Sequence, residues 1–317
     1  MFSFFKFIQN TIKNLKQNKG LWFTILAVLS ITGIFLSLYL LTHMTETASK
    51  DVYKSISKTY DKNFDNKFYI KELEFGKILL SVNSNENLIT NIQENNLVEV
   101  GNIIDNYNND FQGRGFESLE LSFYPVVNQV NQYRNSVNSV ITSKSKLFGL
   151  EVLLDGVYFV QLHPIVRDDE VLAIIEIKEK LEILRRLYIN EDSLFVFLIE
   201  GRMLNRLSIE ARNGNYREVV NDLFVQEKKY DNQFYTKIIE NGEEAYSKML
   251  KDGFYVDDQF YRTAKKISDV NGNVIGTVVL GQTVSNSGAF VNIVDNMTKT
   301  VTTVALGLVI SILLFMF

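Results

Sequence analysis

Between residues 149 and 178, apolar and polar residues alternate with a period of two, which predicts three consecutive antiparallel strands. Asp155-Gly156 and the polar run 167–169 interrupt the alternation, and residues of these types favour the tight turns that join neighbouring strands. Apolar side chains occur at both parities of the second and third strands. We therefore expect other parts of the chain to cover both faces of this sheet.

A similar pattern recurs further along the chain, at 253–283, with turns at Asp257-Asp258 and Asn271-Gly272. Its closing strand aligns with that of the first stretch, residues 274–278 with residues 171–175. Three-stranded meanders that follow a helical segment are the second half of a PAS-like α/β module. The degenerate repeat therefore predicts an α+β chain with two tandem PAS-like modules, although other α+β folds that contain a meander stay open.

An uncharged apolar segment at 21–41 predicts a transmembrane helix, because its helical length of about 30 Å matches a bilayer core. The alternative is a cleaved signal peptide, whose apolar region is usually only about 7 to 15 residues long. Four lysines precede the segment and none follows before Lys50, which places the N-terminus in the cytoplasm and the following residues outside. The N-terminal stretch 1–20 is expected to lie on the inner membrane surface as a basic amphipathic helix.

The uncharged C-terminal segment 300–317 predicts a second membrane helix of about 27 Å, barely enough to cross. No Lys or Arg follows it to mark a cytoplasmic end.

A long helix is expected at 45–81, where apolar residues recur every four positions from Val52 to Phe68. Such a stripe winds around a helix and can serve two partners in turn, the modules and a second subunit. The remaining pattern predicts short helices at 87–108, 126–141, 178–187, 217–225 and 234–240, and strands at 116–124 and 194–200.

Composition excludes several classes of protein. With 317 residues, 46% of them apolar, and two prolines, the chain can bury a sizeable core. The absence of cysteine excludes disulfides, thiol catalysis and cysteine-based zinc sites. Residues 1–43 hold four lysines and no acidic residue, so the rest of the chain is more acidic than the net charge of −4 indicates. A nucleic-acid partner is therefore not expected.

Enzymatic chemistry has little support in the sequence. The two histidines are His43, at the predicted membrane boundary, and His163, so a histidine metal site is nearly excluded and a Ser-His-Asp triad would depend on His163. Neither a GxxxxGK[ST] nor a GxGxxG phosphate motif occurs. We expect no enzyme activity, no catalytic residue, no cofactor and no metal.

The order of long helix, strand, arginine-bearing helix and GLEV…DG…P…E..AIIEI resembles the membrane-distal module of double Cache sensor domains, third subtype. Gly149-Leu150-Glu151, Pro164 and Glu176 match by position, and Arg134 lies where this subtype tends to place an arginine in the helix. The stretch DVNGNVIGTVVLGQT resembles the closing hairpin of the proximal module. One departure is Val160, which stands where an arginine is expected, so a ligand carboxylate paired to that arginine is not implied here.

The resemblance implies a double Cache extracytoplasmic sensor of a bacterial inner-membrane receptor that binds a small molecule. Because receptors of this kind continue into a HAMP or output domain, the chain is expected to be a fragment, with a natural stand-alone sensor as the alternative. A homodimer is expected because relative motion of four membrane spans gives a cytoplasmic partner something to read. The expected output is chemotaxis through a methyl-accepting receptor; the alternatives are a histidine kinase, a cyclic-di-GMP enzyme, or a membrane-tethered binding protein without output. The implied organisation is a cytoplasmic N-terminus at 1–20, membrane helices at 21–43 and 300–317, a long helix with helical lead-in at 44–108, a distal module at 109–188, a proximal module at 189–287 and a juxtamembrane helix at 288–299.

The candidate ligand-binding residues are polar side chains on otherwise apolar strands and on the covering helix. They are Tyr124, Arg134, Glu151, Tyr158, Gln161, His163 and Glu176. They do not all line one face, because Tyr158 and Gln161 have opposite parity in a regular strand. A contact of Arg134 with Glu176 or Glu151 would leave the pocket apolar and neutral, whereas an unpaired Arg134 would recruit an anionic ligand.

Residues 44–299, produced without the two flanking apolar segments, are expected to be soluble and folded, because those segments hold nearly all the continuous apolar sequence. Size-exclusion chromatography and circular dichroism would check this. Aggregation of that piece, while the full chain is folded in detergent, would refute the two-span topology.

Overall fold

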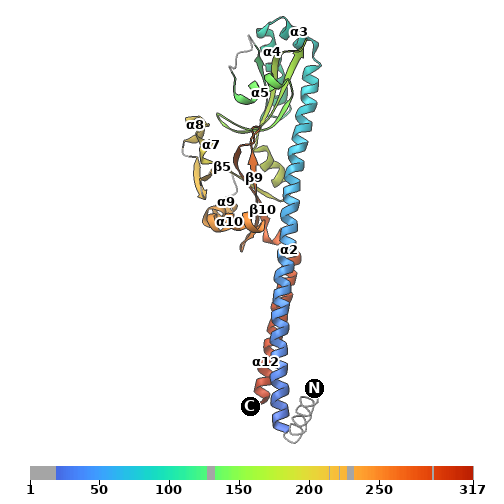
Figure 1. The fold of residues 1–317 in the computed structure, drawn as a ribbon, viewed down its shortest axis with the longest axis vertical. Helices are drawn as coiled ribbons and strands as arrows, with labels where there is room; N and C mark the ends of the chain where they lie inside the picture. Colours follow the sequence, from blue (N-terminus) through green and yellow to red (C-terminus); the bar gives the residue numbers. More distant parts are fainter. Residues whose placement is uncertain are drawn as a thin grey trace, which may run out of the picture. The chain divides into compact units, whose positions relative to one another are not determined.

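The computed structural model describes residues 19–126, 133–213, 215–220, 222–226, 232–287 and 289–316 (Figure 1). These residues form two compact units. One is Ile56–Val284, and the other combines the described residues before Ile56 with those after Val284. The basic stretch predicted at 1–20 lies outside the described residues up to residue 18.

The long helix α2, Lys19–Asn83, joins the predicted membrane segment and the predicted long helix without a break. By length and composition, its apolar part is sufficient to cross a membrane. Near the C-terminus, α12 comprises Ala289–Met316, within which the apolar stretch Asn296–Ile312 is shorter. Thr45 of α2 and Thr298 of α12 share a hydrogen bond of 3.0 Å between their hydroxyls.

The first module, as we call it, contains a four-stranded antiparallel sheet in the order β1-β4-β3-β2. The three strands predicted at 149–178 are confirmed as β2 to β4. Its elements are α3 (Glu86–Gln93), α4 (Leu97–Gly113), β1 (Leu119–Pro125), α5 (Asn135–Ser143), β2 (Leu147–Leu153), β3 (Gly156–Arg167) and β4 (Glu170–Lys180).

Of the two turns predicted for this sheet, the β3–β4 turn is found where the sequence predicts it, and the β2–β3 turn is shifted by one residue. Asp168 and Asp169 both have positive φ, 49° and 64°, as the favoured two-residue hairpin turn requires. In the other turn, Leu153 pairs with Gly156, so the turn residues are Leu154 and Asp155 and the predicted Asp155-Gly156 turn is shifted.

Both faces of the first sheet are covered, as predicted. On one face, the Phe68 ring of α2 makes edge contacts with Phe148 and Phe159, each with a 5.2 Å centroid separation. On the opposite face, Val137 and Val140 of α5 pack against Leu162 and Ile174. Two layers of helix therefore enclose the sheet, and a polar side chain on either face is withdrawn from water.

The second module contains a six-stranded sheet in the order β6-β7-β5-β10-β9-β8. The helix α6 (Ile183–Ile189) precedes it and α11 (Val284–Ser287) follows it. Its elements are β5 (Leu194–Glu200), α7 (Gly201–Leu204), α8 (Ile209–Arg212), β6 (Tyr216–Val220), β7 (Leu223–Gln226), α9 (Asn232–Glu240), α10 (Gly242–Asp252), β8 (Tyr255–Val256), β9 (Phe260–Ser268) and β10 (Val274–Thr283).

Three helix predictions need correction. The segment 217–225 forms the β6–β7 hairpin, because Asp222 adopts a left-handed φ of 63° and the strands bury Val220 and Val225 in the core. The helix predicted at 178–187 begins only at Ile183, since β4 continues to Lys180 to pair with β3. The helix predicted at 126–141 begins at Asn135, and residues 127–132 lie outside the described part of the chain.

Polar contacts hold α2 against the second module. The Ser57 hydroxyl donates to the Gly253 carbonyl at 2.7 Å, and Lys67 forms an ion pair with Glu191. The Tyr60 hydroxyl lies 3.1 Å from that of Ser193. Ser57 and Lys67 are buried in the helix face that the sequence predicted to be apolar. This face of α2 therefore carries both apolar and polar side chains, and each of these polar side chains has a hydrogen-bond or ion-pair partner in the second module.

Replacing Ile175 by aspartate is expected to destabilise the fold by about 3 kcal/mol or more, because its side chain is fully buried and the new charge would have no partner. Urea unfolding would measure the loss. The matched control is Val166→Asp at a half-exposed site of the same sheet, where about 1 kcal/mol or less is expected. Equal losses in the two variants would place Ile175 outside the core.

Candidate functional site

The first sheet separates the predicted site residues into two groups. Strand pairing places Tyr124, Glu176, Tyr158 and Glu151 on the face that α5 covers. Gln161 and His163 lie on the opposite face, with Phe148 and Phe159. The predicted difference in parity between Tyr158 and Gln161 is therefore confirmed.

Arg134 brings most of the first group together. It is the residue immediately before α5, with extended backbone angles of φ −61° and ψ 158°, so it is not inside a helix as predicted. Its Nε donates to Glu151 at 2.9 Å and its Nη1 donates to the Tyr124 hydroxyl at 2.7 Å, while its Nη2 donates to Glu176. One guanidinium thus contacts two carboxylates and a phenol from three strands.

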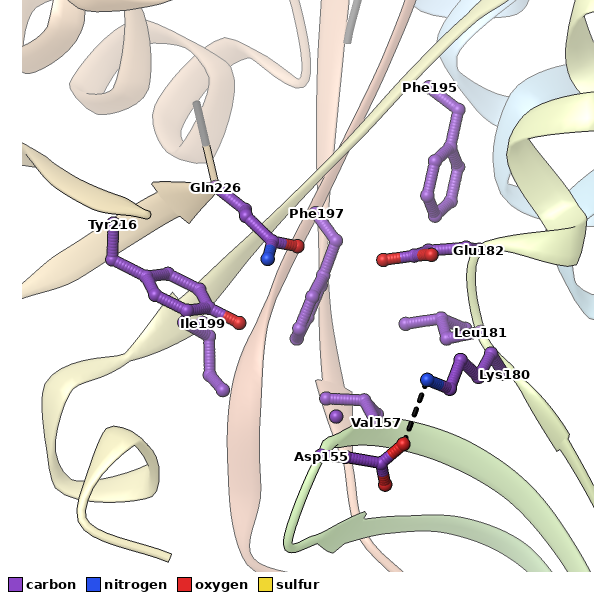
Figure 2. A pocket seen from close by; sticks show the side chains of 11 residues that line it. Asp155, Val157, Lys180, Leu181, Glu182, Phe195, Phe197, Ile199, Tyr216 and Gln226 are labelled. Atoms are coloured by element: carbon purple, nitrogen blue, oxygen red, sulfur yellow. Dashed lines mark ion pairs between the residues drawn. The ribbon is translucent and has the colours of Figure 1, made fainter. Parts of the chain in front are cut away.

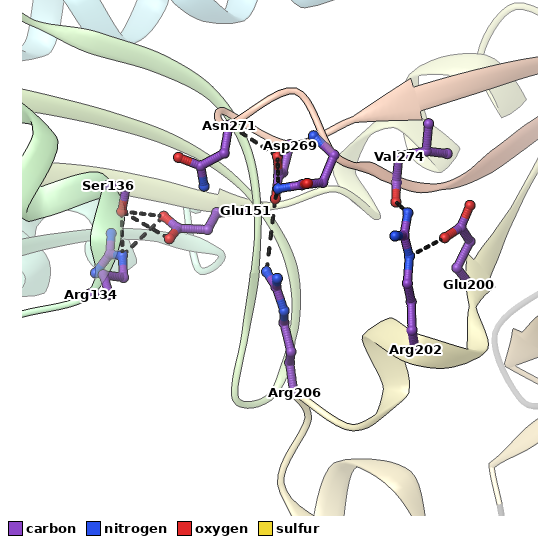
Figure 3. A network of polar contacts seen from close by, with 10 residues as sticks. Arg134, Ser136, Glu151, Glu200, Arg202, Arg206, Asp269, Asn271 and Val274 are labelled. Atoms are coloured by element: carbon purple, nitrogen blue, oxygen red, sulfur yellow. Dashed lines mark hydrogen bonds and ion pairs between the residues drawn. The ribbon is translucent and has the colours of Figure 1, made fainter.

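Two hydroxyl groups complete this cluster. The Tyr124 hydroxyl donates to Glu176 at 2.7 Å. The Ser136 hydroxyl donates to Glu151 at 2.8 Å (Figure 3). Burial, reinforced by the negative charge of Glu176, raises the pKa of Tyr124 and keeps the phenol neutral. The hydroxyls therefore supply hydrogen bonds to the carboxylates without supplying charge.

Arg134 has more acidic partners than the sequence expectation considered. Burial opposes the guanidinium charge, but Glu176 and Glu151 outweigh it and raise the pKa of Arg134. The Glu176 side chain is fully buried, and that of Glu151 is 9% exposed. Arg134 therefore contacts two carboxyl groups, whereas the sequence expectation considered a contact with one of them, and the neutrality of the pocket stays a prediction.

The cluster opens onto a cleft between the two modules, with a volume of about 500 Å³. Glu151 and Arg134 form part of one wall, and Arg206 forms part of the wall that the second module contributes (Figure 3). The residues that line the cleft are Arg134, Asn135, Glu151, Val152, Arg206, Asn271 and Asn273. A small molecule in this cleft would contact both modules.

Backbone contacts fix the two walls of the cleft against each other. The Val270 amide donates to the Leu150 carbonyl at 2.9 Å, and the Ser208 amide donates to the Leu154 carbonyl at 2.6 Å. Leu150 lies in β2, the edge strand of the first sheet, and Leu154 lies in the turn after that strand. The second module therefore supplies hydrogen-bond donors to backbone carbonyls at this edge of the sheet. A Cβ atom at Gly149 would lie 2.8 Å from Val270 Cγ1, which shows how closely the modules approach.

The remaining three candidates lie apart from the Arg134 cluster. Tyr158 donates to Asp155 at 2.6 Å, and Asp155 forms an ion pair with Lys180 at 2.8 Å. Asp155 and Lys180 line a smaller cavity of about 40 Å³ with Phe195, Phe197 and Tyr216 (Figure 2). This pair therefore belongs to a separate contact region between the modules.

On the α2 side, Gln161 is 2% exposed, and its Oε1 accepts no hydrogen bond from the described residues. Burial, together with the positive charge of Lys146, lowers the pKa of His163. Both properties are those of residues packed inside a covered sheet, away from the cleft.

Six residues that the sequence did not single out as candidates belong to the site, two of them being the cleft-lining Asn135 and Val152. Ser136 lies two positions after Arg134, and Asn271 had been identified only as a turn residue. Arg206 and Asn273 are brought to the cleft by the docking of the second module, which no local pattern encodes. Among the described residues, no group of three or more His, Cys, Asp or Glu side chains is arranged to hold a metal ion.

The second module has an arginine at the position equivalent to Val160, the residue that stands where the resemblance expects an arginine in the first module. Val160 pairs with Lys178 in the first sheet, and Arg262 pairs with Gly281 in the second. Extending the sequence repeat makes Lys178 equivalent to Gly281, so Arg262 occupies the position of Val160. Arg262 is fully buried and forms an ion pair with Asp257.

No protein-family description matches this sequence, and no curated protein does so. Solved structures with a similar fold include the sensor domain of the V. cholerae histidine kinase DctB, with 10% identity over 73% of this chain and 98% of that chain, at a TM-score of 0.40. Another is the Campylobacter jejuni chemoreceptor Tlp3 ligand-binding domain in complex with 4-methylisoleucine, with 11% identity over 78% of this chain and 94% of that chain, at a TM-score of 0.38.

A further structure of Tlp3, with isoleucine bound, has 12% identity over 80% of this chain and 98% of that chain, at a TM-score of 0.37. These neighbours are double Cache sensor domains. At such identities and TM-scores, the likeness carries nothing about the ligand of this chain.

Replacing Arg134 by alanine is expected to destabilise the fold by about 3 to 5 kcal/mol, because it leaves the buried Glu176 and Glu151 without their cation. The matched control is Arg114→Ala, which removes an exposed pair with Asp110 and should change stability by about 1 kcal/mol or less. Urea unfolding of both variants is the measurement. A loss at Arg134 no larger than that at Arg114 would contradict the buried charge cluster.

Proposed function

We propose that this chain is the extracytoplasmic sensor part of a transmembrane signal-transduction receptor, and that a small molecule binds in the cleft beside Arg134. The observation that carries the proposal is the charge cluster, in which one guanidinium faces two carboxylates at the inner wall of the cleft. Such a cluster is not needed to hold the sheet, since a buried ion pair is weak support for stability compared with apolar residues of the same volume.

The ligand that this cluster suits carries a positively charged group such as an amine. Two carboxyl groups beside one guanidinium favour a cation over an anion, and Glu151 is the cluster member with a carboxylate at the cleft wall. An anionic group at the same place would face two carboxylates.

The proposed receptor is a non-enzymatic, two-pass protein of the bacterial inner membrane, with spans at 21–43 and 300–317 and sensor modules at 109–188 and 189–287. Support comes from the apolar part of α2 and from the apolar stretch Asn296–Ile312 of α12. Exposed apolar residues Tyr69, Leu73 and Leu80 on α2 support a homodimer through that helix.

The proposed output is that of a methyl-accepting chemotaxis receptor, through a cytoplasmic region that follows the second span. A histidine kinase or a cyclic-di-GMP enzyme with the same sensor is the alternative. A membrane-tethered binding protein without output is a third candidate, and the reading frame downstream of Phe317 distinguishes it from the other two.

Primary amines are expected to raise the melting temperature of the full chain in lipid nanodiscs, whereas matched carboxylic acids are not, because only the amines complement the cluster. The variant Glu151→Gln removes the negative charge at the cleft and should abolish the response. The control Glu120→Gln changes an exposed carboxylate on the same sheet and should keep it. Equal responses in these two variants, or a response to acids alone, would refute the proposed site.

A further inference from the structure

We infer that the smaller cavity between the modules, beside Lys180 and Tyr216, is a second ligand site that takes a small uncharged molecule with a carbonyl and an amino group, such as a carboxamide. No residue lines both this cavity and the cleft beside Arg134. The inference therefore adds a site to the proposed function and does not depend on the ligand of the cleft.

The second sheet supplies the apolar floor of this cavity. Phe197 and Ile199 of β5 line it, and they lie on the face opposite the core of the second module, because Val196 and Leu198 alternate with them and belong to that core. From the first module, Leu181 lines the cavity directly after β4. Such a floor favours the flat side of a small planar molecule.

Two uncharged polar side chains extend over this floor from neighbouring strands. Tyr216 of β6 pairs directly with Gln226 of β7, so the two side chains lie next to each other on one face of the sheet. Figure 2 shows the Tyr216 hydroxyl and the Gln226 amide directed toward the Phe197 ring. Within the described part of the chain, neither group has a hydrogen-bond partner. Both are consequently available to a ligand.

The charged side chains of the cavity are already engaged. Lys180 forms its ion pair with Asp155 at 2.8 Å, and Glu182 has a partner as well. Burial, reinforced by the negative charge of Glu182, raises the pKa of Tyr216 and keeps its hydroxyl neutral. The groups left for a ligand are therefore uncharged, and a charged ligand would lose its water without gaining an unpaired counter-charge.

The hydrogen-bonding groups define the chemistry of the ligand. The amide of Gln226 offers both an N–H donor and a carbonyl acceptor, and the hydroxyl of Tyr216 can act in either sense. A carboxamide or urea group presents the complementary pair, a carbonyl oxygen and an N–H, in one plane. Such a molecule can form hydrogen bonds with Gln226 while its flat side lies on Phe197.

The volume of the cavity sets the size of the ligand. The cavity measures about 40 Å³, and one buried water occupies about 10 to 15 Å³ of such a volume. The space therefore suits a molecule of about three or four non-hydrogen atoms. Acetamide is a planar carboxamide of about this size.

Binding here would act on the joint between the modules. Leu181 belongs to the first module, where its amide donates to the Val157 carbonyl at 2.9 Å, whereas Tyr216 and Gln226 belong to the second. A ligand in the cavity contacts both sides of the joint. Occupancy then favours the docked arrangement of the modules through mass action.

The test uses the full chain in lipid nanodiscs and three planar probes of matched shape: acetamide, acetate and acetamidinium. Saturation-transfer difference NMR measures the binding of each probe, and empty nanodiscs correct for transfer from lipid. Acetamide is expected to bind about two- to tenfold more tightly than either charged probe. A ligand of this size is expected to have a Kd no lower than about 0.05 mM.

Two variants of Gln226 assign the site. Gln226→Leu removes the amide and should weaken acetamide about two- to tenfold, whereas the control Gln259→Leu, at an exposed position of the same module, should not. Gln226→Glu places a carboxylate at the ligand and should shift the preference to acetamidinium, which a purely structural role of Gln226 would not produce. Glu151→Gln should leave acetamide binding unchanged, because Glu151 lines the other cleft.

Three results would overturn the inference. Binding of acetate or acetamidinium to the parent chain as tight as that of acetamide would contradict an uncharged ligand class. Equal affinities for acetamide in Gln226→Leu and Gln259→Leu would place its binding elsewhere. Saturation transfer to acetamide no greater than in empty nanodiscs, up to about 0.1 M, would refute the site itself. None of these results bears on the cleft beside Arg134, which the amine experiment tests separately.

Discussion

The withdrawal of two carboxylates from water in the first sheet is the constraint on which the candidate site depends. Glu176 is fully buried, and both it and Glu151 depend on Arg134 for charge compensation. An ionised carboxylate without a partner in such surroundings costs several kcal/mol, so the arginine, its position before α5 and the two supporting hydroxyls are fixed together. The same arrangement places two carboxyl groups beside one guanidinium where the first sheet meets the second module, and the proposed preference of the cleft for a cation rests on this ratio.

The rest of unit Ile56–Val284 positions the walls of that cleft. The second module contacts the first through two backbone hydrogen bonds, to Leu150 and Leu154, and through the region where Asp155 and Lys180 lie beside Phe197. Polar contacts of Ser57 and Lys67 attach α2 to the second module. The joint beside the cleft is the element that the proposed two-state response would use, because a ligand that binds one arrangement of the modules more tightly shifts the equilibrium toward it.

How much the sequence predicted depends on whether the determining contacts are local. The strands β2 to β4 and the α2 helix follow from periodicities of 2 and 3.6, and Arg134 with Glu176 could be paired as a hypothesis because an unpaired buried charge is costly. The β6–β7 hairpin was missed because its apolar spacing also fits a helix, and the left-handed Asp222 that settles it has no unique sequence signal. Ser57, Lys67 and Arg206 have partners or neighbours far away along the chain, so their roles arise only when the modules dock.

Whether ligand binding reaches the membrane-flanking helices is tested most directly by the distance between α2 and α12. The chain has no native cysteine, so spin labels at Thr47→Cys and Asn296→Cys report on these helices alone, close to the Thr45–Thr298 contact. With a saturating primary amine in nanodiscs, the account predicts a shifted distance distribution, and no shift when Glu151→Gln is also present. An unchanged distribution at full occupancy would contradict the sensor account and leave a passive, membrane-tethered binder.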